Sequence, residues 1–343
     1  MALLFADSFD HYATADIETK WTTNTNFAIS ANGRNSTSSL SMTVNGASPR
    51  SITKTVSPAG NTNTIIIGAA FKCALNAIQE VFSIWDSAVE HVSLSVDTAG
   101  VMKVFRGSSA GTLLGTCSGA LSSGVYAYIE LKVLISDTVG TVEVRVNGST
   151  VLGPLTSQDT RNAGNASWTG IQLCNQGSNT TSWATHYDDL VIMDSTGAVN
   201  NDFMGDVRIK AQLPSTGNGS NTDFTPSTGT DHGALVDEAT PNTSDYNSSN
   251  TAGQRDTYNY PSLGLSGTVK AVQTVMYWGK SDGGIRTVAP VHRISGVNYD
   301  GTAVGIGTAF TYFMQVYETS PATAAAWTTT EINSTETGGK VVT

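Results

Sequence analysis

The stretch that decides the fold class is residues 126–148, YAYIELKVLISDTVGTVEVRVNG. In its first half, apolar residues alternate with tyrosine or charged residues, and one face collects Ala127, Ile129, Leu131, Val133 and Ile135. A turn follows at residues 136–140, and residues 141–147 alternate again, with valines on one face. Alternation with period two on both sides of a short polar turn predicts an antiparallel hairpin with one face in a core.

The same pattern extends outward through the first two hundred residues. Further strands are predicted at 64–71, 81–85, 92–96, 101–105, 168–174 and 187–193. The one early helix candidate is short, at residues 14–21, with Thr14 or Asp16 as its cap. Many short strands without intervening helices are typical of an antiparallel sandwich or jelly roll. We therefore expect an all-β fold, with an N-terminal jelly roll over residues 1–198.

A second region begins at the polar linker 194–201. A strand-like segment at 205–213 is followed by residues 214–255, which are rich in Asn, Thr, Ser, Asp and Gly. A stretch of this length without apolar periodicity is unusual in a compact domain and is often functional. We expect a surface loop, held down by Phe224 and Tyr246, that contacts a partner. A passive loop and partial disorder are the alternatives.

Strands resume after residue 255. They are predicted at 256–260, 268–278, 285–294, 309–318 and 340–343, with a short helix at 328–335 where Thr328 and Glu331 have capping-box spacing. Residues 285–294 are expected to form a hairpin with 268–278 and, because they contain Pro290, either to lie at an edge or to contain a bulge. These elements predict a second β-sandwich over residues 199–343.

Composition excludes two classes of partner. The chain has 343 residues, 18 basic against 28 acidic residues and a net charge of -10. Nucleic acid and anionic membrane surfaces both require clustered Lys and Arg, which are scattered here. No apolar stretch approaches the roughly 18 residues of a membrane span. The first residues lack the basic start of a signal peptide, so we expect synthesis in a cytoplasm without ordinary secretion.

The sequence offers no set of catalytic residues. The five histidines are isolated, and no GxSxG motif or phosphate loop occurs in a suitable context. A jelly-roll glycosidase requires two carboxylates on one face, whereas Glu130 is alone on its strand. The three cysteines, Cys73, Cys117 and Cys174, are interpreted as buried thiols, and a disulfide between two of them stays open. We expect a protein that is not an enzyme and has no cofactor.

Two weak ligand sites can be named. Asp188 and Asp189 offer oxygen ligands for a structural calcium ion, although neighbours on a strand point to opposite faces and turn or cap acids are the simpler interpretation. Sugar binding uses exposed aromatic rings and amides, for which Trp168, Trp183 and Asn175 are candidates. Both tryptophans flank strands and serve equally well as core residues.

Two groups of residues carry a family resemblance. The hairpin 126–148, the segment 187–193 (YDDLVIM) and the opening Asp7-Ser-Phe-Asp-His-Tyr12 resemble the concanavalin-A-like, laminin-G-like jelly roll of bacteriophage structural proteins. Residues 203–208 and 247–256, with Tyr299-Asp-Gly-Thr302 and Ala326-Trp327, resemble a module that recurs in tailed-phage virion proteins.

The resemblance implies a structural component of a virion. We expect a tail-associated adhesin or receptor-binding subunit of a fibre, baseplate or tail tip that binds other virion proteins and host surface glycan. The alternatives are a capsid decoration or head-fibre protein and, third, a carbohydrate-active enzyme. Virion positions occur in symmetric sets, so a homo-oligomer such as a trimer is expected.

Overall fold

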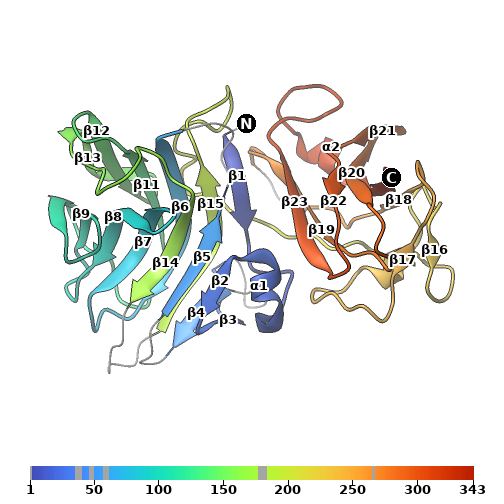
Figure 1. Cartoon of the computed structure of the whole chain (residues 1–343), viewed down its shortest axis with the longest axis horizontal. Coiled ribbons are helices and arrows are strands. Elements are labelled where there is room, and N and C mark those ends of the chain that lie inside the picture. Colours follow the sequence, from blue (N-terminus) through green and yellow to red (C-terminus); the bar gives the residue numbers. More distant parts are fainter. Residues whose placement is uncertain (1, 35–40, 46–49, 57–61, 177–183, 265–266) are drawn as a thin grey trace. The chain divides into compact units, whose positions relative to one another are not determined.

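The computed structural model of the chain describes residues 2–34, 41–45, 50–56, 62–176, 184–264 and 267–343. It divides into two compact units, Met1–Ile209 (unit 1) and Lys210–Thr343 (unit 2). Nearly all regular elements are antiparallel strands, which confirms the all-β fold class (Figure 1). Within these described ranges, no helix is long and apolar enough to cross a membrane.

Unit 1 is a sandwich of two antiparallel sheets. In the described residues, an eight-stranded sheet has the order β13-β12-β11-β6-β15-β4-β3, with β1 also on β15, and a seven-stranded sheet has the order β10-β9-β8-β7-β14-β5-β2. The strands are β1 (Leu3–Asp7), β2 (Thr23–Thr25), β3 (Phe27–Ser30), β4 (Ser41–Asn45), β5 (Arg50–Thr55), β6 (Thr64–Cys73), β7 (Gln79–Asp86), β8 (Val89–Val96), β9 (Met102–Arg106), β10 (Thr112–Thr116), β11 (Ala127–Leu134), β12 (Gly140–Val146), β13 (Ser149–Gln158), β14 (Gly170–Gln176) and β15 (Ala184–Met193).

Hydrogen bonds across the core show how the two sheets face each other. The Tyr187 hydroxyl on β15 donates to the backbone oxygen of Val81 on β7 at 2.7 Å, and its ring packs against Phe71 and Phe82. A buried phenol requires such an acceptor, because leaving its O–H unpaired costs free energy. The predicted hairpin 126–148 is confirmed as β11 and β12, paired from Ile129↔Val146 to Leu134↔Thr141.

The early helix prediction is confirmed in its position, although neither Thr14 nor Asp16 caps α1 through its side chain. A 3-10 turn, η1 (Thr14–Asp16), leads into a single α-helical turn, α1 (Ile17–Lys20). The side chain of Asp16 accepts from the backbone N–H of Ala13 at 3.1 Å and so ties the start of this helical segment. This segment lies beside β1, β2 and β3 (Figure 1).

The segment after β15 corrects two predictions. Residues 205–213 form no strand, because side chains of the eight-stranded sheet take up their backbone groups. Glu130 Oε1 accepts from the N–H groups of Met204 and Gly205, each at 2.9 Å, and Asp189 Oδ1 accepts from Ile209 at 2.7 Å. We call residues 202–209 the strap. Because unit 1 holds the strap, the unit ends at Ile209 and not at the predicted residue 198.

Unit 2 is a smaller β structure with one helical turn and one 3-10 turn. Its described strands form a five-stranded sheet, in the order β18-β24-β20-β21 with β22 also on β20, and the two-stranded pairs β19-β23 and β16-β17. The elements are β16 (Thr225–Pro226), η2 (Gly233–Leu235), β17 (Asn247–Ser248), β18 (Arg255–Tyr258), β19 (Val272–Trp278), β20 (Thr287–Ile294), β21 (Val297–Asp300), β22 (Val304–Gly305), β23 (Thr311–Tyr317), α2 (Thr329–Asn333) and β24 (Glu336–Val341).

The β19-β23 pair packs on the five-stranded sheet. Thr274 Oγ1 of β19 lies 3.0 Å from Nε2 of His292 on β20, and the His292 ring meets the Tyr317 ring edge-on at 4.5 Å. A side chain at Gly339 of β24 would collide with the Trp278 ring, since an added Cβ would lie 2.0 Å from it. Glycine at this position therefore lets the indole lie directly on the sheet.

The predicted hairpin between 268–278 and 285–294 is wrong. β19 pairs with β23, and β20 is an inner strand between β24 and the β21/β22 side. Pro290 is tolerated in an inner strand because it lies between the residues that pair with β22 and those that pair with β21. At this break its carbonyl accepts from Gly301, and no ladder bond requires the N–H that proline lacks.

The C-terminal helix gives a first test of the local structure. Thr328 caps α2, and its hydroxyl accepts from the backbone N–H of Glu331 at 3.1 Å. We expect Thr328→Ala to lower the free energy of unfolding of unit 2 by about 1 kcal/mol, and Thr328→Ser to leave it nearly unchanged. Urea denaturation of both variants checks this, and equal losses would contradict the capping role.

Candidate functional site

The long polar stretch of unit 2 is built around a short ribbon. β16 and β17 pair through Thr225↔Ser248 and Pro226↔Asn247. Beyond them, Ser227 N donates to the Tyr246 carbonyl at 2.8 Å, and Tyr246 N donates to the Ser227 hydroxyl at 2.9 Å. These bonds present the Tyr246 side chain outward, 45% exposed. The predicted surface loop is therefore an ordered structure with an aromatic ring at its surface.

A buried carboxylate anchors this loop to the sheet. Asp256 lies on β18 with no exposed surface, and both of its oxygens are 2.9 Å from Nδ1 of His232, which precedes η2. The Tyr258 hydroxyl donates to Asp256 Oδ2 at 2.9 Å. Burial raises the pKa of Asp256 above its ordinary value, although the bonds from His232 and Tyr258 oppose this. Asn247 of β17 donates to the His232 carbonyl at 2.8 Å and so ties the ribbon to the same cluster.

A second carboxylate holds the start of the loop. Glu336 of β24 accepts from the backbone N–H of Ser220 at 2.8 Å and from the hydroxyls of Ser220 and Thr257 at 2.5 and 2.6 Å. Charge-assisted bonds of this kind are stronger than neutral ones. They lower the pKa of Glu336 below its ordinary value even though burial opposes them. The loop is thus fixed at two places by acids of the sheet beneath it.

The surface that results is polar and has no basic side chain. Residues 211–254 contain five acidic residues and no Lys or Arg, so their formal charge is 0 − 5 = -5. We call this the polar loop surface. Its exposed positions are mainly hydroxyl and amide residues: Thr222, Thr225, Ser227, Thr228, Thr230, Thr240, Asn242, Thr243, Ser244, Ser248 and Asn250. Such a surface can exchange hydrogen bonds with a neutral polar partner and stack its exposed tyrosine on it.

Of the other predicted binding residues, Phe224 belongs to unit 2, and Trp168, Asn175 and Trp183 fall within the range of unit 1. Phe224, next to β16, is half-buried. Trp168 is only 1% exposed and donates from Nε1 to the Thr64 carbonyl at 3.0 Å, so it is a core residue of unit 1 and cannot stack on a sugar. Asn175 lies in β14, and its side chain is outside the described residues, as is the whole of Trp183.

Asp188 and Asp189 do not point to opposite faces. The pairing of β15 with β6 shifts register between Asp188 and Val191, and Asp189 has a φ of 49°, as in a bulge. Both carboxylates therefore reach the same residue: Asp188 Oδ2 accepts from the backbone N–H of Arg34, and Asp189 Oδ2 from its Nε, each at 2.7 Å.

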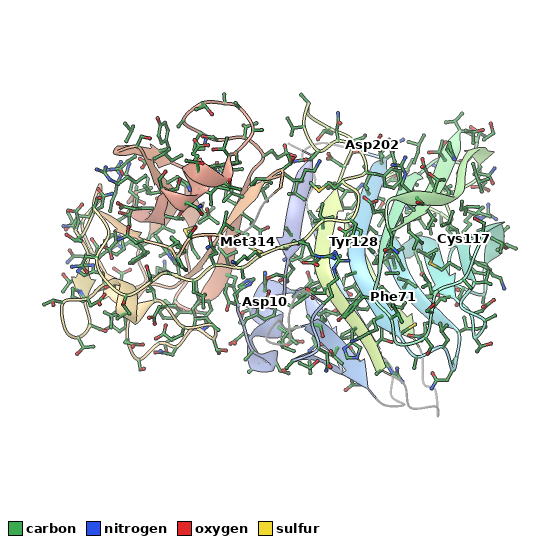
Figure 2. All side chains as sticks on the ribbon, turned by 180° about the vertical axis from the view of Figure 1, so that it is seen from behind. Asp10, Phe71, Cys117, Tyr128, Asp202 and Met314 are labelled. Atoms are coloured by element: carbon green, nitrogen blue, oxygen red, sulfur yellow. The ribbon has the colours of Figure 1, made fainter. Side chains whose placement is uncertain are left out.

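The Arg34 guanidinium balances the charge of Asp189, while its backbone N–H donates to Asp188. Its side chain is 5% exposed, lies 5.0 Å from the centre of the Tyr128 ring, and donates to the Val207 carbonyl of the strap at 2.6 Å (Tyr128 is labelled in Figure 2). Burial, and then the charge of Asp189, raise the pKa of Asp188 to about 7. The guanidinium occupies a position beside Asp189 in which a cation neutralises that carboxylate. The described residues contain no group of three or more potential metal ligands.

The three cysteine side chains are buried. The cysteines Cys73, Cys117 and Cys174 are free and buried, and burial raises the pKa of each thiol to about 12. Alternation in the sequence placed Glu130 on its strand but gave it no role, and it did not identify the other residues that organise these clusters, namely Arg34, His232, Asp256 and Glu336. Each is isolated in the sequence and meets its partners only in the folded chain.

Comparison with known proteins finds neither a matching family model nor a matching curated protein. Among solved structures, the chain is similar in part to alginate lyase AlgAT5 of polysaccharide lyase family 7, at 12% identity and a TM-score of 0.35 over 48% of this chain and 81% of the lyase.

Two further structures show the same degree of likeness. The carbohydrate binding module CBM66 from Bacillus subtilis matches at 9% identity and a TM-score of 0.32 over 51% of this chain and 96% of the module. Trypanosoma rangeli sialidase matches at 15% identity and a TM-score of 0.33 over 45% of this chain, which spans 25% of the sialidase. Likeness at these scores assigns neither ligand nor reaction to this chain.

Proposed function

We propose that this chain is a non-enzymatic structural protein of a bacteriophage virion, a tail-associated adhesin that contacts its partner through the polar loop surface. The observation that carries the proposal is the anchoring of residues 214–255 by buried Asp256 and half-buried Glu336. A loop fixed in this way loses little conformational entropy on binding, which favours affinity. The resemblance of residues 126–148 and 187–193 to phage jelly rolls supports a place in the virion.

The partner we propose is a neutral polar surface, such as host glycan, or a neighbouring virion protein. The absence of Lys and Arg between residues 211 and 254 disfavours anionic partners, because five carboxylates would repel them. Exposed hydroxyl and amide groups suit sugar hydroxyls, and the Tyr246 ring suits an apolar sugar face. The alternative is that the chain is a capsid decoration protein that uses the same contact surface.

The engagement of the acids supports a binding role over catalysis. Glu130 accepts two backbone N–H groups of the strap, and Asp188 and Asp189 share Arg34. A glycosidase requires a carboxylate pair that is open to substrate and within roughly 5–10 Å. The acids that the sheet of unit 1 brings together are instead used to hold its own loops.

Location in particles tests the first half of the proposal. We expect cryo-EM and quantitative mass spectrometry of purified virions to place a few to a few tens of copies at the tail. Copies in the hundreds on the shell would favour the decoration alternative. If the protein is absent from particles, the virion assignment fails.

Tyr246→Ala tests the contact surface. We expect it to weaken adsorption to host cells, or binding to isolated host glycan, by about tenfold, because exposed tyrosines often carry about 1–2 kcal/mol of contact energy. Val297→Ala, which truncates another exposed side chain of unit 2, is the matched control and should bind as the wild type does. Unchanged thermal unfolding would show that both variants fold, and equal adsorption of the two would contradict the proposal.

A further inference from the structure

A lysine and an aspartate meet in a fully buried site of unit 1. Asp7 ends β1 and Lys20 ends α1, and Lys20 Nζ lies 2.9 Å from Asp7 Oδ1. Neither side chain has any exposed surface. The ammonium group lies against the rings of Tyr12 and Phe5, with its nitrogen 4.9 and 5.7 Å from their centres.

Two neutral side-chain donors lie at one oxygen, Oδ2, of the Asp7 carboxyl group. Asp7 Oδ2 accepts from the Tyr12 hydroxyl at 2.8 Å and from Trp21 Nε1 at 3.1 Å. Asp7 Oδ1, the oxygen nearer the amine, accepts from the backbone N–H of Phe9 at 2.9 Å. Two donors on one oxygen of a carbonyl group are what stabilises the negative charge of a tetrahedral intermediate.

A proton acceptor also contacts the amine. His11 Nε2 lies 2.8 Å from Lys20 Nζ. An ammonium group can only donate, so the ring accepts at Nε2 and carries its own proton on Nδ1. Burial, and then the charge of Lys20, lower the pKa of His11 to about 3, so the ring is neutral and able to accept. The site therefore holds a nucleophile with a proton acceptor beside it, an acyl group and oxyanion donors.

Burial favours the uncharged form of this pair. Removing two ions from water is costly, and their attraction repays the cost only in part. A second lysine adds to this: Lys54 Nζ lies 4.6 Å from the centre of the same Phe5 ring, and burial and the charge of Lys20 lower the pKa of Lys54 to about 8. Burial likewise lowers the pKa of Lys20, although Asp7 opposes this. A desolvated amine held against a carboxyl group is a strong nucleophile by proximity.

We propose that Lys20 and Asp7 condense within the folded chain to form an isopeptide bond between Nζ and Cγ. The ammonium proton passes directly from Nζ to Asp7 Oδ1, which lies 2.9 Å away, the free amine attacks Cγ, and Oδ2 carries the negative charge between Tyr12 and Trp21. When the Cγ–Oδ1 bond breaks, Oδ1 leaves as water with the second amine proton. One ammonium and one carboxylate give one amide and one water, with no oxidant or other reactant.

Protonation of the Asp7 carboxyl group limits the rate of this reaction. Burial raises the pKa of Asp7, but the charge of Lys20 and the hydrogen bonds from Lys20 and Phe9 outweigh it, so this pKa stays below its ordinary value. Protonation of Oδ1 is therefore rare, and proton transfer from Lys20 to Oδ1 is the step on which the rate depends. We expect the bond to form after folding and to accumulate with time, and His11→Phe, which removes the acceptor that holds Nζ, to slow its formation.

The product would be a covalent clasp over residues 7–20. It joins the first strand of the jelly roll to the helical turn that follows. A clasp at this position would keep β1 in its sheet when the chain is pulled or heated, which a virion component must withstand.

A mass measurement of the full-length chain tests the proposal. We expect the denatured, aged wild-type protein to weigh less than its sequence by one water. Trypsin cannot cleave after a lysine whose amine is acylated, so the N-terminal peptide should end at Arg34, carry the same loss of water, and fragment as a loop between Asp7 and Lys20. A succinimide at Asp7 also loses water, but it leaves Lys20 open to trypsin.

Two variants complete the test. Lys20→Arg keeps the charge but cannot form the amide, and should show the full mass. Lys72→Arg, at a half-exposed lysine of the same unit, is the matched control and should show the loss of water. Full mass and cleavage after Lys20 in the aged wild type would overturn the proposal, and this result stands even if Lys20→Arg fails to fold.

Discussion

Replacing Arg34 with methionine is expected to lower the free energy of unfolding of unit 1 by about 3–5 kcal/mol at pH 8, the range for breaking one side of a buried ion pair. Methionine keeps much of the volume and the packing on Tyr128 but removes the charge that pairs with Asp189, next to Asp188. It also removes the bond to the Val207 carbonyl, so the strap should open more often. Urea denaturation gives the loss of stability, and hydrogen exchange at Ile209 gives the opening of the strap.

The loss should be smaller at pH 5. In the folded wild type the pKa of Asp188 is raised to about 7, above its ordinary value of 3.8. A group whose pKa is raised by folding contributes stability at low pH that is lost as the pH rises through that window. At pH 5 Asp188 is protonated in the folded chain, so Arg34→Met leaves only Asp189 unbalanced. At pH 8 Asp188 is charged as well, so the substitution leaves two adjacent carboxylates that repel each other.

Arg208→Met is the matched control for this experiment. Arg208 pairs with Asp206 of the same strap, but its side chain is half exposed, and exposed pairs contribute about 0–1 kcal/mol. We expect a small loss at both pH values. If the two variants lose the same stability, or if the loss from Arg34→Met is independent of pH, the acid pair is not held as described.

Strands β6–β9, β11, β12, β14 and β15 of the first unit could be predicted because each carries its own apolar run or alternation, whereas β1–β5, β10 and β13 were not predicted. Residues 126–148 specify two strands and a turn within one continuous stretch, and the structure forms them as β11 and β12. What alternation cannot predict is which strands pair across long separations. β19 pairs with β23 and not with the nearby β20, and the sequence between β19 and β20 contains the same turn residues that an actual hairpin would have. Pairing of this kind depends on tertiary packing, such as that of Trp278 on Gly339, which alternation does not encode.

The site was predictable only as a region. The lack of apolar periodicity in residues 214–255 indicated a surface loop, and Tyr246 is indeed exposed. Asp188 and Asp189 were noticed as a pair, but the bulge at Asp189 turns both toward Arg34, which lies more than a hundred residues earlier. Alternation predicts opposite faces only while a strand keeps its register. The roles of isolated polar residues such as His232 and Asp256 cannot be predicted from the sequence pattern, because these residues act through a contact between distant segments.

Asp256→Ala is expected to have the largest effect in unit 2. It leaves the Nδ1 group of His232 and the hydroxyl of Tyr258 facing a buried space with no acceptor. Each buried donor without a partner costs about 1–3 kcal/mol, so we expect a loss of about 2–4 kcal/mol in the free energy of unfolding. Asp256→Asn keeps one oxygen acceptor and should lose less. Asp282→Ala, which breaks an exposed pair with Arg286, should lose at most about 1 kcal/mol.

The effect on the loop separates anchoring from general destabilisation. Because Asn247 binds the His232 carbonyl, release of His232 should also loosen β17 and the Tyr246 side chain beside it. We expect hydrogen exchange in residues 231–247 to rise under conditions in which β19 and β23 stay protected, and adsorption to fall as far as in Tyr246→Ala. A uniform rise across unit 2 would mean that Asp256 supports the sheet alone. Normal adsorption with a loosened loop would mean that the polar loop surface does not need its anchored form to bind.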